Sequence, residues 1–143
     1  MKGGGRMGWP FVNVKATLHY GKFHEVDSSE LAFYTAGQIA FRQAVADNTT
    51  LLEPYMKLSV QVPEEFIGDV IGDLNTRRVE VDEIAVTGDL REVRGAVPSA
   101  EMFNYAGRLR GLTQGRGMFS MEPLNYRPVP QFVVDKLLKD QTK

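Results

Sequence analysis

The sequence predicts an α+β fold with a small partial domain in front of a complete one. Apolar residues alternate with period two over residues 9–20 and 57–62, a pattern typical of strands, and residues 79–87, 91–98 and 117–124 also read as strands. Helical spacing with clear start signals lies between these segments. From residue 56 onward the order is strand, helix, strand, strand, helix, strand. This order predicts a ferredoxin-like β-α-β-β-α-β domain, with two helices on one face of an antiparallel sheet.

The first half of the chain predicts one strand and one helix. Consecutive glycines in "MKGGGRMG" are typical of a loop cut open or of a natural flexible tail. The strand over 9–20 leads to a helix from Ser28 to about residue 46. Asp27 is the predicted cap, with Glu30 reaching back to it, and Val26 and Leu31 stand at the positions of a hydrophobic staple. One strand and one helix cannot make a sheet domain, so this half is expected to be incomplete or to pack on something else.

The second half is more regular. Pro63 opens a helix with two acids in its first turn, and Arg77-Arg78 stand at its negative end. Gly88 and Asp89 make the turn between two strands. Ser99 is expected to cap one helix that runs to about residue 113, and residues 129–139 read as a last short helix. The expected buried stripe of the helix from Ser99 is Phe103, Ala106, Leu109 and Leu112.

Composition and charge exclude several classes of protein. The chain has 143 residues, 43% hydrophobic and 24% charged, which suits one or two small domains, predicted as 1–52 and 53–143. A net charge of -1 argues against a general nucleic-acid coat protein but leaves a local basic patch open. No cysteine is present, which excludes disulfides, thiolate zinc sites and cysteine nucleophiles. Without a membrane-length apolar run or a secretion signal, we expect a cytoplasmic protein with no membrane partner.

Few motifs carry catalytic chemistry. His19 and His24 have no partner at metal-ligand spacing, so no metal site is expected. Gly21-Lys22 lacks the rest of a phosphate-binding loop. Glu64 and Asp69 could act as an acid–base pair, although acids at a helix start more often stabilise the helix.

The segment "NYAGRLRGLTQGRG" (104–117) is the most suggestive one. Arg108, Arg110 and Arg116 occur with no acid between Met102 and Met121. Arginines and glycine-loop amides suit phosphate contacts, and Arg77-Arg78 would add to such a surface. Cations that match the negative end of a helix are the equally good alternative.

Several motifs together resemble a known family. These are "HEVDSSELAF", "LLEPYMKL", "PEEFIGDVIGDLNTRR", "AVPSAEMFNYAGRLRGLTQGRG" and "FSMEPLNYRPVP". In this order they resemble the C-terminal part of bacterial translation elongation factor G, over residues 8–130. The resemblance implies the second half of domain IV at 1–52 and domain V at 53–143. It also implies a ribosome-binding piece of a translocation GTPase that is not itself an enzyme, because the domain that binds GTP and Mg²⁺ is not among the matched motifs.

The resemblance also implies site residues. The turn in "KFHEVDSS" matches the tip that enters the decoding site beside tRNA and mRNA, which assigns Lys22, His24, Glu25, Asp27 and Ser28 to that contact. Contacts with ribosomal RNA fall to Arg77, Arg78, Arg108, Arg110 and Arg116, as a weaker inference. No cofactor is expected in this chain. One departure is Val79, which follows Arg78 where the family usually has glycine.

Three alternatives stay open. A paralogous ribosome-recycling or ribosome-protection factor shares these motifs. A stand-alone ferredoxin-like module could sense a small molecule or form oligomers through the open face of its sheet. A small enzyme could use the Glu64 and Asp69 pair.

Overall fold

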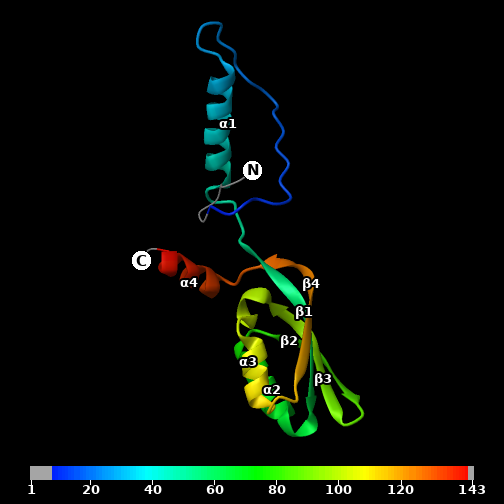
Figure 1. Ribbon diagram of the computed structural model, residues 1–143. Coiled ribbons are helices and arrows are strands. Elements are labelled where there is room, and N and C mark those ends of the chain that lie inside the picture. The colour runs from blue at the N-terminus through cyan, green and yellow to red at the C-terminus, as the bar shows by residue number, and fades with distance from the viewer. Residues whose placement is uncertain (1–7, 142–143) are drawn as a thin grey trace. The chain divides into compact units, whose positions relative to one another are not determined.

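In a computed structural model, the structure describes residues 8–141, so the glycine run at residues 3–5 lies outside it. The chain divides between Thr50 and Leu51 into two compact units (Figure 1). We call residues 8–50 unit 1 and residues 51–141 unit 2, and each is described by itself. Within the described range, no helix has the length and apolar character needed to cross a membrane.

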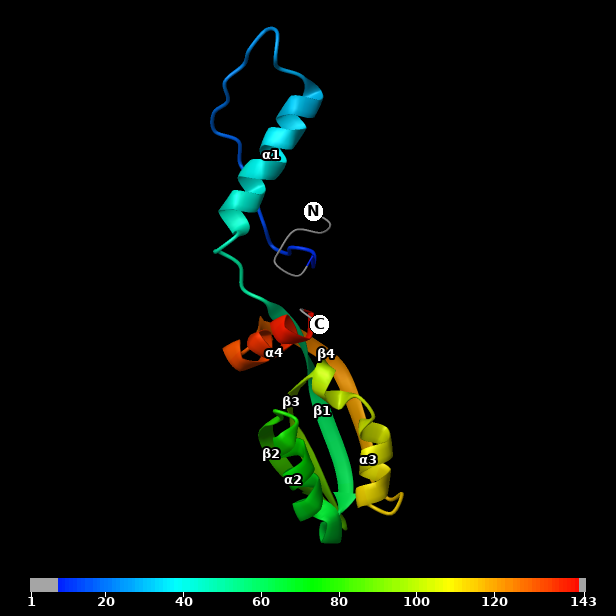
Figure 2. The ribbon, with the colours of Figure 1, turned by 90° about the vertical axis from the view of Figure 1, so that its left-hand side faces the viewer.

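Unit 1 holds one helix, α1 (Glu30–Val45), preceded by an extended segment that runs back along it (Figures 1 and 2). The strand predicted over 9–20 was wrong, because this segment forms no ladder. A strand needs a neighbour that exchanges backbone hydrogen bonds with it, and the described part of unit 1 supplies none. Phe11 packs edge-on against Phe41 with ring centroids 5.3 Å apart. No residue of α1 is buried, so unit 1 has no core of its own.

The start of α1 also differs from the prediction. Ser29 is the N-cap, and its Oγ accepts a hydrogen bond at 3.1 Å from the helix backbone three residues later. Asp27 therefore lies outside the helix, and Glu30 comes too early to complete a capping box. Val26 and Leu31 are exposed, so the predicted staple does not form. Two consecutive serines follow Asp27, and the sequence alone did not show which residue would cap.

Unit 2 is built on a four-stranded antiparallel sheet with strand order β2-β3-β1-β4. Its strands are β1 (Leu52–Pro63), β2 (Glu80–Thr87), β3 (Leu90–Pro98) and β4 (Met118–Pro128). With one helix after β1 and another after β3, this is the predicted ferredoxin-like arrangement. β1 and β4 extend beyond their predicted ends because they pair with each other from Leu52↔Pro128 to Gln61↔Met118.

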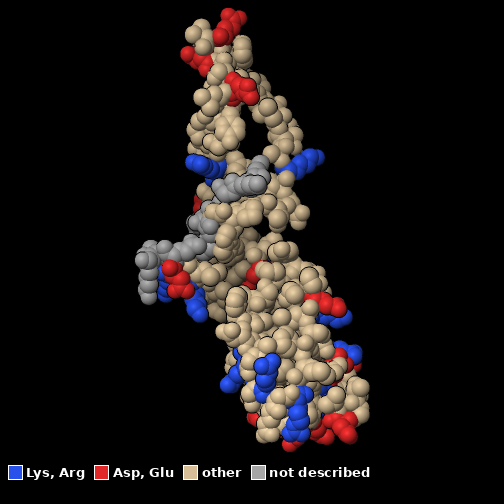
Figure 3. All heavy atoms as spheres, viewed as in Figure 1, with Lys and Arg blue, Asp and Glu red and all other residues tan. Residues whose placement is uncertain are grey.

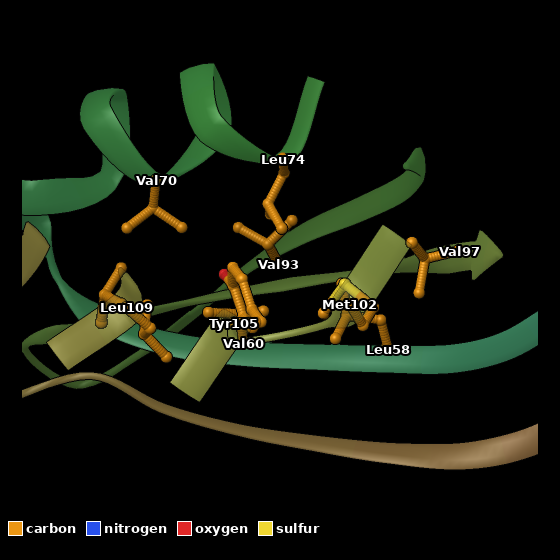
Figure 4. Packing of buried hydrophobic residues seen from close by; sticks show 10 residues of the cluster. Leu58, Val60, Val70, Leu74, Val93, Val97, Met102, Tyr105 and Leu109 are labelled. Carbon is orange, nitrogen blue, oxygen red and sulfur yellow. The ribbon is translucent and has the colours of Figure 1, made fainter. Parts of the chain in front are cut away.

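Helices α2 (Ile67–Thr76) and α3 (Tyr105–Leu112) supply the core on one face of this sheet. A short 3-10 turn, η1 (Glu64–Phe66), leads into α2. Figure 4 shows Val70 and Leu74 of α2 facing the strands, with Tyr105 and Leu109 of α3 beside them. The strands contribute Leu58, Val60, Val62, Val93 and Val97, all almost fully buried. This apolar layer holds unit 2 together, since buried area is the main stabilising term.

The helix predicted from Ser99 to residue 113 is two pieces. A 3-10 turn, η2 (Ser99–Met102), ends at Phe103, and α3 starts only after Asn104, whose φ of 59° is left-handed. The break shifts the buried stripe to Met102, Tyr105, Leu109 and Thr113. Phe103 and Ala106 were therefore wrongly predicted as buried, and both are exposed. The sequence pattern missed the break at Asn104, although Leu109 is buried as predicted.

The open face of the sheet is polar. Ser59, Arg94 and Glu83 stand in register across β1, β3 and β2. Glu92 lies next to them, with Oε1 accepting from Ser59 Oγ at 2.7 Å and Oε2 accepting from Arg94 Nη2 at 2.7 Å. An apolar dimer interface, as the oligomerising alternative requires, is not what this face offers.

The last helix, α4 (Gln131–Gln141), follows β4. Val129 joins the end of β4 to the start of the unit, because its backbone N donates to the Leu51 carbonyl at 2.9 Å. Val133 and Val134 are half-buried, whereas Phe132 is exposed. The helix therefore stands near its predicted position, shifted by two residues.

Candidate nucleic-acid interface

Residues 22–28, which we call the tip, form a closed turn ahead of α1. The Ser28 backbone N donates to the His24 carbonyl at 2.9 Å, and the His24 backbone N donates to Ser28 Oγ at 2.6 Å. Glu25 and Asp27 lie within this ring, and Lys22 stands in the extended segment just before it. The two reciprocal hydrogen bonds hold the turn in one conformation, although its side chains are exposed.

Charge at the tip is weakly acidic. His24 Nδ1 lies 3.6 Å from Asp27 Oδ2, and more than 70% of each side chain is exposed, so water screens this pair. Figure 3 shows acidic side chains gathered at the end of unit 1 where the turn meets α1. Any RNA contact here would therefore depend on hydrogen bonds and shape more than on charge attraction.

Arg77 and Arg78 point into the protein. Arg78, in a left-handed conformation with φ of 58°, forms a two-pronged ion pair with Glu53 at 2.8 and 2.9 Å. Its Nε donates to Glu101 at 2.9 Å. The hydrogen bonds to Glu53 are the main cause that raises the pKa of Arg78. The left-handed backbone of Arg78 turns the chain out of α2, and the Val79 backbone N donates to the Leu74 carbonyl at 3.3 Å.

Asp73 is the centre of a second network that sequence reasoning missed. Its side chain is only 8% exposed and accepts from Arg77 Nε at 2.8 Å and from Arg108 Nε at 2.9 Å. Burial alone would raise the pKa of Asp73, but these two arginines outweigh it and lower the pKa. The spacing of four residues between Asp73 and Arg77 on one helix was the available sequence signal.

Arg108, Arg110 and Arg116, which we call the arginine surface, face solvent. Arg108 is 58% exposed, and the hydrogen bond that holds it to Asp73 uses its Nε, so this bond leaves the two terminal nitrogens available to a ligand. Arg116 pairs with Glu65 at 2.6 Å and lies 4.7 Å over the Phe66 ring. Arg110 is exposed on α3 and makes no ion pair with the described residues.

The loop between Arg110 and Arg116 is held by Thr113. Its buried Oγ1 donates to the Leu109 carbonyl at 2.7 Å and accepts from the Gly117 backbone N at 2.8 Å. Gly117 has no room for a side chain, because an added Cβ would press on Thr113 and Leu109. The absence of a side chain at Gly117 therefore allows a tight turn from α3 into β4. The hydrogen bonds of Thr113 hold the loop that carries the arginine surface in a defined conformation.

The acid–base alternative finds little support. Glu64 lies in η1 and pairs with Arg91 at 2.8 Å, which occupies its carboxylate, and Asp69 is exposed on α2. Across residues 8–141, no three His, Cys, Asp or Glu side chains gather as a possible metal site.

Comparisons with known proteins decide the family. Residues 50–137 match the family model described as elongation factor G C-terminus, and residues 1–48 match elongation factor G, domain IV. The chain belongs to the elongation factor G family. The resemblance given by the sequence motifs is confirmed, and the chain is part of a translation elongation factor.

A solved structure supports the same assignment. The crystal structure of a protein from Thermus thermophilus is 36% identical, with a TM-score of 0.79. The match covers 99% of this chain and 22% of that one. This chain thus spans less than a quarter of the length of that protein.

Proposed function

We propose that this chain binds the ribosome and serves the translocation of tRNA and mRNA in the cytoplasm, as a non-catalytic part of a GTP-driven elongation factor. Family membership supports the class of process. The observation that carries the RNA contact is Arg108, whose Nε is held by Asp73 while its side chain is 58% exposed. A guanidinium fixed in this way loses little freedom when it binds a phosphate.

The two units have separate roles in this proposal. The arginine surface of unit 2 contacts ribosomal RNA phosphates, and the tip of unit 1 reaches tRNA and mRNA at the decoding site through His24 and Lys22. Arg77 and Arg78 have a structural role, because their guanidinium groups form ion pairs within unit 2. Arg77 pairs with Asp73, and Arg78 pairs with Glu53 and Glu101.

Salt-dependent binding to isolated ribosomes tests the unit 2 contact. Each lost phosphate contact should reduce the slope of log affinity against log salt by about 0.7–0.9. We expect Arg110→Ala/Arg116→Ala to lower both affinity and slope. Lys136→Ala/Lys139→Ala on α4 removes the same charge elsewhere and should leave both almost unchanged. Equal losses in the two double variants would show general charge attraction and would contradict the assigned surface.

Binding to isolated small subunits that carry tRNA and mRNA tests the tip. His24→Ala should weaken this binding, with little change in slope, because the contact is a hydrogen bond more than a charge pair. His19→Ala, an exposed histidine on the extended segment of the same unit, is the matched control. Equal binding of both variants and the unmodified chain would exclude the tip contact.

A further inference from the structure

Phe103 is displayed to solvent by the backbone. It is 81% exposed, the highest exposure among the large hydrophobic residues described in unit 2. Its neighbours Met102 and Tyr105 are buried, and Asn104 turns the chain through a left-handed conformation between η2 and α3. The bend thus anchors the residues on both sides of Phe103 in the core and leaves its ring outside.

Arg77 makes this bend rigid. Its Nη1 donates to the Glu101 carbonyl at 2.7 Å and to the Phe103 carbonyl at 3.5 Å. The same guanidinium lies 5.1 Å over the Tyr105 ring and is tied to Asp73. A half-buried arginine with this many partners cannot move freely, so the position of the Phe103 backbone is fixed before any ligand arrives.

An open cation stands on the same support. Arg108 lies in the first turn of α3. Its backbone N donates at 3.2 Å to the carbonyl of Asn104, the residue that follows Phe103. Its side chain shares the Asp73 carboxylate with Arg77. Asp73 accepts from both arginines, so two positive charges share its one negative charge, and the segment from Met102 to Met121 adds no acid. Glu101, the nearest other acid in sequence, is paired with Arg78.

We propose that Phe103 and Arg108 form a two-point site for an unpaired RNA nucleotide, with the base stacked on the Phe103 ring and a phosphate on the terminal nitrogens of Arg108. The site rests on the proposed function and names the RNA element that unit 2 would take: a loop or bulge with an unstacked base. Aromatic stacking accepts any base face, whereas bases inside an RNA duplex are stacked and closed to it. Three arginines and no acid lie in the segment between Met102 and Met121, and this local excess of positive charge favours RNA over an apolar segment of a protein.

Two short RNAs of equal length test the site on the intact chain, one a hairpin with an unpaired loop and the other a blunt duplex. Phe103→Ala should weaken hairpin binding about 5- to 150-fold, the range of one lost stacked base. It should leave duplex binding and the salt slope unchanged, because no charge is lost. Arg108→Ala should weaken binding of both RNAs and reduce the slope.

Matched variants separate stacking from other effects. Phe132→Ala removes another exposed aromatic of unit 2 and should leave hairpin binding unchanged. Phe103→Tyr should bind like the unmodified chain, and Phe103→Leu should bind like Phe103→Ala. Because Phe103 is exposed, all variants should unfold at the same urea concentration.

The outcomes are decisive. Equal binding by Phe103→Ala and Phe132→Ala would overturn the site, as would full binding by Phe103→Leu, which would point to a protein contact. Failure to prefer the hairpin while ribosome binding persists would remove this site and leave the proposed function standing. Loss of ribosome binding itself would remove both.

Discussion

Asp73 holds Arg108 of α3 from the C-terminal half of α2: its Oδ1 accepts from Arg108 Nε at 2.9 Å, while Oδ2 accepts from Arg77 Nε at 2.8 Å. One carboxylate thus serves two guanidinium groups with opposite tasks. Arg77 also donates to the Glu101 carbonyl in the bend before α3, whereas the Arg108 side chain is 58% exposed to solvent.

Replacing this carboxylate should cost stability. Asp73→Asn removes the negative charge that two arginines share and one of its two acceptor oxygens, and breaking a buried pair costs about 3 kcal/mol. We expect the free energy of unfolding, measured in urea, to fall by about that amount. Asp69→Asn, one turn earlier on the exposed side of α2, should change it by less than about 0.5 kcal/mol. Similar effects of the two variants would show that the Asp73 network contributes little.

The open sheet face predicts a specific acid response. Hydrogen bonds from Arg94 and then Ser59 lower the pKa of Glu92 from 4.5 to about 2. A folded-state pKa below the unfolded value means that the stabilisation is present above pH 4.5 and is lost as the pH falls through about 2.

Glu92→Gln should therefore be less stable than the unmodified chain at neutral pH, and the difference should shrink between pH 4.5 and about pH 2. Urea midpoints measured across this range check it. Glu122 is an exposed acid on β4, so the urea midpoint of Glu122→Gln should change with pH in the same way as that of the unmodified chain. A constant difference for Glu92→Gln would mean that the lowered pKa is absent.

Two glycines of unit 2 should respond in opposite directions to alanine. A Cβ on Gly95 of β3 would collide with the Glu80 carbonyl of β2, so β2 must shift. We expect Gly95→Ala to destabilise unit 2 by about 1–3 kcal/mol and to speed amide exchange in β2. Gly68 of α2 has open space, so Gly68→Ala should stabilise the helix by about 0.5–1 kcal/mol. Opposite signs in urea unfolding confirm the assignment, and equal signs contradict it.

The two consecutive serines of the tip should have separable roles. Ser29→Ala removes the cap and should lower protection against amide exchange in the first turn of α1 by about 1 kcal/mol. Ser28→Ala should instead expose the His24 amide and leave the helix start protected. A reversal of this pattern would place the cap at Ser28.

The fold of unit 2 was predictable because its signals are local and repeated. The alternation along β1, the acids after Pro63 and the turn at Gly88 each report on neighbouring residues only. The break at Asn104 was not predictable, because a left-handed residue changes which later side chains face the core without changing their spacing in the sequence. The strand at 9–20 failed for the opposite reason: its pattern is good, but a ladder needs a second strand.

The candidate site divides in the same way. Sequence placed Arg108, Arg110 and Arg116 in one segment, and the structure puts them at the surface. It could not show that the Arg78 side chain is paired within the protein, since its partners Glu53 and Glu101 lie more than twenty residues away, whereas Asp73, the partner of Arg77, lies only four residues away. Phe103 was predicted to be buried, so its display to solvent is visible only in three dimensions. Whether these residues contact RNA stays a prediction.

The lack of buried side chains in α1 has a practical meaning for anyone who prepares this chain. A protease attacks backbone that opens easily, and α1 has no buried residue to resist opening. Brief digestion should trim the chain back toward Leu51 and leave a resistant product that contains the sheet. The same helix exposes Phe33, Tyr34 and Ile39 to solvent. In a cell, we expect chaperones to bind this exposed apolar surface as they bind an incompletely folded protein. The time for which unit 1 survives proteolysis should therefore depend on how far another molecule covers its exposed helix.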